Sequence, residues 1–195
     1  TYSVADIAGL NFVTKRILTN AAGAIAGFAA AALTPIPSTR GATIAATMFG
    51  VTTTCVTRCR ESLERSGHQV LVFHATGVGG QSMETLIRDG LIEVSLDITT
   101  TELADELVGG VFSAGPDRLS AAGDAGIPQV VSVGALDMVN FGAPESVPAQ
   151  CSTWTFHRHN DFDTLMTPPP AQSAQLGRRH ADIASSSRRP PPIPL

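Results

Sequence analysis

The chain has 195 residues, enough for one domain with a sizeable core. Only 15% of its residues are charged and the formal net charge is -4, so the basic face of a nucleic-acid-binding protein is not expected. Three cysteines, an odd number, and no visible signal peptide predict reduced thiols and a cytoplasmic location. No membrane association is expected, because the apolar run at residues 21–33 is too short to span a bilayer.

The elements expected in chain order begin with a helix of small residues at 11–33, which ends at the Pro-containing segment 34–38. Short apolar runs then alternate with helical patterns. Strands are expected at residues 43–49, 69–75, 91–98 and 128–133. Helices are expected at residues 54–66, 81–89, 101–108 and 117–124. A loop at 142–150, a strand at 152–159 and a helix at 171–185 complete the pattern.

Nearly all-apolar strands that alternate with helices predict a parallel sheet covered on both faces. Right-handed crossovers then give an α/β fold, a three-layer Rossmann- or flavodoxin-like parallel sheet, which we expect to be incomplete at both ends. The expected regions are an N-terminal helix and linker at 1–40, the α/β domain at 41–165, and a poorly ordered Pro- and Arg-rich tail at 166–195. The low charge content reflects either the many Ala and Gly residues or a surface covered by a missing domain or second subunit.

The loops after the predicted strands are rich in threonine and glycine. Ligands of open parallel sheets bind beyond the carboxyl ends of the strands, where hydroxyls and the amides of helix N-termini can hold a phosphate. The candidate nucleotide-binding residues are Thr52, Thr53, Thr76, Gly77, Gly79, Gly80, Thr99, Thr100, Thr101 and Gly115. Helix capping is the alternative reading, and Thr99 with Glu102 fits a capping box. No Lys follows the glycines, so residues 76–80 are not a Walker A loop.

Titratable residues near the same predicted edge suggest two further roles. Asp97 and Asp137 are candidate ligands of a Mg²⁺ ion that arrives with a nucleotide, although Asp97 could equally cap the next turn. His74 follows a strand beside the glycines and is a candidate acid–base residue, with a buried, hydrogen-bonded histidine as the alternative. His157, His159 and Asp161 match part of a metal-binding motif whose other ligands are absent from the sequence.

Longer motifs resemble a known family. They are NAAGAIAG (20–27), TMFGVTT (47–53), VFHATGVGG (72–80), TTTELADEL (99–107), SAGPDRL (113–119) and GIPQVVSVGALDMVNFG (126–142). These segments are similar to bacterial and fungal proteins of uncertain function that are related to the ATP-binding N-terminal region of the tomato mosaic virus resistance protein. The resemblance covers residues 4–165 and departs from the family at its end, where residues 165–167 read Leu-Met-Thr.

The resemblance implies two Rossmann-like subdomains, of which this chain resembles the second. It implies ATP and Mg²⁺ as ligands, an N-terminal subdomain as partner, and a homo-oligomer of the full-length protein. The leading hypothesis is therefore a fragment of an ATP-binding protein of uncertain activity. Two alternatives stay open: an enzyme that acts on a small phosphorylated or carboxylated metabolite with His74 as acid–base, and a protein-interaction module.

Overall fold

The computed structural model describes residues 9–35, 41–161, 163–168 and 178, and it divides the chain into two compact units, Thr1–Ser38 and Thr39–Leu195. The first unit contains one helix, α1 (Phe12–Ala32). Its N-cap is Asn11, whose side chain accepts hydrogen bonds from the backbone amides of Val13 and Thr14. The structure confirms this predicted helix, whereas the helix predicted at 171–185 lies outside the described residues.

The second unit is built on a four-stranded parallel sheet. Its strands are β1 (Thr43–Met48), β2 (Gln69–His74), β3 (Val94–Thr99) and β4 (Gln129–Gly134). They lie in the order β2-β1-β3-β4, and every pairing is parallel. This order is that of flavodoxin-like sheets, and the predicted α/β fold class is confirmed.

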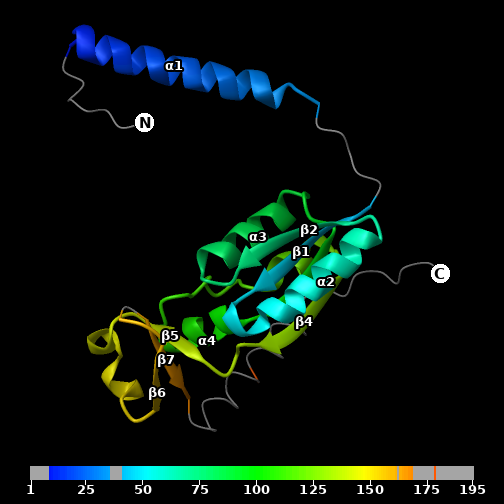
Figure 1. Ribbon diagram of the computed structural model, residues 1–195, viewed down its shortest axis with the longest axis vertical. Helices are drawn as coiled ribbons and strands as arrows, with labels where there is room; N and C mark the ends of the chain where they lie inside the picture. The colour runs from blue at the N-terminus through cyan, green and yellow to red at the C-terminus, as the bar shows by residue number, and fades with distance from the viewer. Residues whose placement is uncertain (1–8, 36–40, 162, 169–177, 179–195) are drawn as a thin grey trace. The chain divides into compact units, whose positions relative to one another are not determined.

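Helices cover both faces of this sheet. They are α2 (Thr53–Arg65), α3 (Val78–Arg88), α4 (Thr101–Val108) and α5 (Ser120–Ala125). The chain moves from β1 outward to β2 and then back to β3, so right-handed crossovers place α2 and α3 on opposite faces, as Figure 1 shows. Met83 and Ile87 of α3 pack with Ala121 and Ala122 of α5 and with Ala45 of β1, which makes this side the better buried one.

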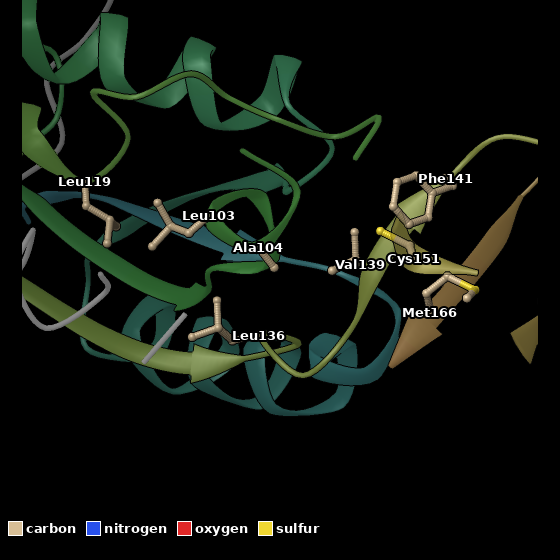
Figure 2. Packing of buried hydrophobic residues seen from close by; sticks show 8 residues of the cluster. All are labelled: Leu103, Ala104, Leu119, Leu136, Val139, Phe141, Cys151 and Met166. Atoms are coloured by element: carbon tan, nitrogen blue, oxygen red, sulfur yellow. The ribbon is translucent and has the colours of Figure 1, made fainter. Parts of the chain in front are cut away.

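A second, antiparallel sheet follows the first. It consists of β5 (Val139–Phe141), β6 (Thr155–Arg158) and β7 (Thr164–Thr167) in the order β5-β7-β6. Two 3-10 turns, η2 (Pro144–Ser146) and η3 (Ala149–Cys151), lie in the segment predicted to be a loop. Val139 and Phe141 join Cys151, Met166 and Leu103 in an apolar cluster that connects this sheet to α4 (Figure 2).

Several predicted boundaries are wrong. Helix α3 begins at Val78, three residues before the predicted start, and β3 begins at Val94 because the chain first turns after α3. The helix predicted from residue 117 begins at Ser120, since Leu119 has a φ of 79° that a right-handed helix cannot contain. Within the part of the chain that the structure describes, no helix has both the length and the hydropathy needed to cross a membrane.

Candidate functional site

A cavity of about 570 Å³ lies at the carboxyl edge of the parallel sheet. Its lining comes from the segments that follow β1, β2 and β4 and from the hairpin between β6 and β7. Gly50, His74, Thr76, Met138 and Leu165 are among the lining residues. Open parallel sheets bind ligands at this position, and small-molecule sites have volumes of about 300–1,000 Å³. This cavity is therefore the candidate functional site.

Three aromatic rings form one wall of the cavity. The ring centroid of Phe49 lies 5.4 Å from that of His74 and 5.9 Å from that of Phe112, and both pairs meet edge to face. The turn that carries Phe49 is fixed by Thr52, whose hydroxyl lies 3.0 Å from both the backbone nitrogen and the carbonyl oxygen of Phe49. Such a wall presents aromatic surface suited to a flat ring.

The strand β5 supplies a polar group to the same cavity. Asn140 lines the cavity, is 1% exposed, and holds its amide nitrogen 3.2 and 3.3 Å from the two carboxylate oxygens of Asp105. Asp105 also accepts the backbone amides of Asn140 and Phe112, at 2.9 and 2.8 Å. Burial raises the pKa of Asp105 to about 6, against the opposing effect of these donors. The hydrogen bonds to this carboxylate orient the asparagine.

The amides of Gly77 and Gly80 are occupied by a carboxylate of the protein itself. Both donate to Oε1 of Glu102, at 2.8 and 3.0 Å. A Cβ atom on Gly80 would lie 2.3 Å from Glu102, and one on Gly79 would lie 1.8 Å from the carbonyl oxygen of His74. In this structure the glycines therefore serve close packing, and Glu102 takes the place that a phosphate would need.

Glu102 belongs to a buried ionic cluster around Arg118. The guanidinium contacts Glu102 at 2.7 Å, Glu84 at 3.1 Å and Asp97, and its side chain is 0% exposed. Burial would lower the pKa of Arg118, but Asp97 and Glu102 outweigh it and raise the pKa. Burial also raises the pKa of Glu102, and Arg118 offsets this only in part. A second, partly exposed cation, Arg88, contacts Glu84 at 3.4 Å, so the three carboxylates share two arginines.

Asp97 does not reach the cavity. Its second carboxylate oxygen accepts hydrogen bonds from Ser95 at 2.7 Å and from Gln129 at 2.9 Å, and the residue is 0% exposed. Its partners are Arg118 of the cluster and these residues of β3 and β4, so Asp97 is poorly placed for the predicted Mg²⁺ role. Asp137 is exposed on the turn after β4, next to the cavity residue Met138.

The predicted threonines chiefly hold loops and strands together. Thr99, Thr100 and Thr101 are all 0% exposed. The hydroxyl of Thr99 donates to the backbone of β1 at 3.1 Å and shares a 2.7 Å hydrogen bond with Thr52, and that of Thr100 donates to the backbone of β4 at 2.9 Å. Thr53 is exposed, and its hydroxyl donates to the carbonyl four residues earlier at 3.1 Å. The N-cap of α4 is Thr100, so the capping box predicted for Thr99 is not formed.

The remaining predicted residues separate into two places. His74 is exposed and Thr76 is partly buried, and both line the carboxyl-edge cavity. Gly115 instead lines a different cavity of about 650 Å³, with Glu84 and Arg88 of α3. The structure thus brings His74 and Thr76 to the candidate site and places Gly115 elsewhere.

The three residues of the predicted partial metal-binding motif have separate surroundings. His157 lies 3.1 Å from the hydroxyl of Thr167, Asp161 pairs with Arg158, and His159 lines the cavity. No cluster of three or more His, Cys, Asp or Glu residues suited to a metal ion occurs in the described ranges 9–35, 41–161 and 163–168.

No role was predicted from the sequence for Phe112, Asn140 or Arg118. Asn140 and Arg118 lie within the family motifs at 126–142 and 113–119, and Phe112 directly precedes the second of these. The usable signal for Asn140 is its position between Val139 and Phe141 in a short run of strand-forming residues, which indicates a polar side chain directed away from the apolar face. The pairing of Arg118 with carboxylates up to 34 residues away has no local signal.

Fold and cavity together define a flavodoxin-like α/β protein with a ligand-sized cavity at the carboxyl edge of its sheet. The chain belongs to the uncharacterised protein family UPF0261: residues 41–193 match its C-terminal domain and residues 1–34 match its N-terminal domain. The link to a bacterial family of uncertain function that the motifs indicated is therefore confirmed.

The relatives include a UPF0261 protein of Clostridium tetani, 51% identical over 179 residues, which are 91% of this chain and 44% of the relative. A UPF0261 protein of Mesorhizobium japonicum is 52% identical over 84% of this chain and 41% of its own length. The ToMV resistance protein Tm-1(GCR237) of Solanum lycopersicum is 48% identical over 84% of this chain and 22% of its own length. The chain thus spans less than half the length of these relatives.

Proposed function

We propose that this chain binds ATP in the carboxyl-edge cavity and forms a nucleotide-binding part of a longer protein. The observation that carries the proposal is the cavity itself, which follows three parallel strands and has an aromatic wall. An adenine ring offers flat apolar faces to such a wall. Three of the motifs quoted for the family resemblance, at 47–53, 72–80 and 126–142, contribute residues to this one cavity.

The phosphates have a better place than the predicted glycine loop. A helical segment starts at the cavity with the 3-10 turn Gly50–Thr52 and continues as α2. The first amides of a helix have no intrahelical acceptor and mark the positive end of its dipole, so they attract anions. Gly50 and Val51 both line the cavity, and a Cβ atom on Gly50 would meet nothing within 4 Å. We place the phosphate chain beside these two amides.

The Mg²⁺ ion enters this proposal only together with ATP. It would be held by phosphate oxygens and carboxylate, the ligands that Mg²⁺ prefers, and it would neutralise phosphate charge. Of the two predicted aspartates, Asp137 fits this role because it is exposed beside the cavity, whereas Asp97 is committed to Arg118.

A thermal-shift titration with ATP and Mg²⁺ tests this function. At a ligand concentration one hundred times the Kd, binding stabilises the folded state by about 2.7 kcal/mol, which raises the melting temperature of a domain of this size by roughly 5–10 °C. Gly50→Phe should abolish the rise while leaving the melting temperature without ligand nearly unchanged, because its side chain enters open space at the cavity.

Val130→Phe is the matched control, since Val130 is 54% exposed on β4 and does not line the cavity. It should keep the full ATP-dependent rise. An equal rise in both variants would mean that ATP binds elsewhere, and the absence of any rise in the unmodified chain would refute the function.

A further inference from the structure

Asn140 has an unusual hydrogen-bonding state. Its Oδ1 atom is buried and has no hydrogen-bond partner among the described residues. An unpaired buried acceptor costs stability, and native proteins seldom keep one without a reason. A hydrogen-bond donor supplied by a ligand would satisfy this acceptor.

The strand pairing directs this side chain to the cavity. Asn140 is the register partner of Leu165 in the antiparallel pair of β5 and β7, and paired residues project to the same face. Both residues line the cavity. Their neighbours Val139 and Phe141 point to the opposite face, where they join the apolar cluster of Figure 2.

The orientation of the amide is fixed by its surroundings. The Nδ2 atom lies 3.1 Å from the hydroxyl of Thr101 and 3.2 and 3.3 Å from the carboxylate oxygens of Asp105. Only the NH₂ group can donate to a carboxylate, and a flipped amide would place Oδ1 against acceptor oxygens. Asp105 is itself held by the backbone amides of Asn140 and Phe112. The atom left without a partner is therefore the acceptor Oδ1, on a residue that lines the cavity.

We propose that Asn140 reads the base of the nucleotide, with Oδ1 accepting a hydrogen bond from an exocyclic ring amine. The inference rests on the proposed nucleotide-binding function and adds the selection of a 6-amino purine. Adenine donates from its amine at ring position 6, whereas hypoxanthine and guanine carry a carbonyl acceptor there. A carbonyl facing Oδ1 would leave two acceptors opposed and both unpaired.

Isothermal titration of the unmodified chain with ATP and with inosine triphosphate (ITP), both with Mg²⁺ at pH 7.5, tests the selection. The two nucleotides differ at ring position 6, where ATP has an amine and ITP a carbonyl, and at N1, which is an acceptor in ATP and carries a hydrogen in ITP. We expect the Kd of ITP to be at least about tenfold higher, the effect of leaving one buried acceptor unpaired. Equal affinities would overturn the inference and leave the proposed function intact, whereas binding of neither nucleotide would overturn the proposed function.

A variant tests whether Asn140 is the residue that distinguishes ATP from ITP. In Asn140→Ser the ratio of the two Kd values should fall towards one, provided that the variant still melts cooperatively. A ratio that stays at the unmodified value would show that another residue reads the base. Should the variant fail to fold, the comparison of ATP with ITP in the unmodified chain still decides whether the site requires an amine.

Discussion

Arg118 is a fully buried cation that holds three elements together. Its partners Glu84, Asp97 and Glu102 belong to α3, β3 and α4, and two of them also accept backbone amides. Removing one partner of such a group is costly, because the remaining charges stay buried without compensation. The cluster therefore fixes the loop after β2, which contributes Thr76 to the cavity.

The substitution Arg118→Met should lower the free energy of unfolding by about 3–5 kcal/mol at pH 8, since it leaves the buried carboxylates of Asp97 and Glu102 without a cation, while Glu84 keeps its ion pair with Arg88. Urea denaturation measures this loss. Arg158→Met is the matched control: Arg158 and Asp161 are 61% and 78% exposed, so their pair contributes at most about 1 kcal/mol. Losses of similar size in the two variants would contradict the structural role of the cluster.

Individual site residues were only partly predictable. His74 lies at the end of a predicted strand and Thr76 directly follows that strand, so their position at the carboxyl edge of the sheet was predictable. Both residues line the cavity. The hydrogen bond from the backbone amide of Gly77 to Glu102 joins residues 25 positions apart, and no local sequence pattern predicts such a contact. The roles proposed from sequence for His74 as acid–base and for ATP as ligand stay predictions.

At the scale of elements, the junction of β2 and α3 is the tightest part of the site. Helix α3 starts at Val78, so Gly79 and Gly80 lie in its first turn, where glycine is otherwise unfavourable. A Cβ atom on Gly79 would collide with the backbone of His74, and one on Gly80 would collide with the side chain of Glu102, which explains why both positions are glycine. Glycine here allows the helix to start directly against the strand end.

Gly79→Ala should therefore lower the free energy of unfolding by at least about 2 kcal/mol, because its Cβ atom would meet the backbone carbonyl of His74 and could not be relieved by a side-chain rotation. Gly50→Ala, at the start of the other helical segment of the site, should change stability by less than about 1 kcal/mol, since its Cβ atom meets nothing. Chemical denaturation compares the two, and equal effects would show that α3 does not pack as described.

The main strands and helices of the second unit were predictable because its strand segments are rich in apolar residues and each of its helices ends near a glycine. The strands β5 and β7, with three and four residues, were missed. Such short segments show too few alternations to be distinguished from loops, and only their mutual pairing stabilises them. Since they supply Asn140 and Leu165, the polar side of the cavity was not predicted.

At the scale of the whole molecule, the first unit taken by itself carries exposed apolar side chains. Phe12, Phe28 and Leu33 of the first unit are 85%, 74% and 85% exposed. Exposed apolar surface of this kind marks contact sites. Residues 1–34 match the family's N-terminal domain, and we propose that the rest of that domain covers α1 in the full-length relatives. The cavity, by contrast, is lined entirely by the second unit.

The central claim is that ATP binds in the carboxyl-edge cavity of this chain. The chain has four methionines, of which Met138 lines the cavity and Met83 is buried between α3 and the sheet. A titration of chain labelled with ¹³C at the methionine methyl groups, assigned by Met→Leu substitutions, reports on each position separately. The account predicts that the Met138 signal shifts saturably with ATP while the Met83 signal stays in place. A Met138 signal that does not move at millimolar ATP would contradict it.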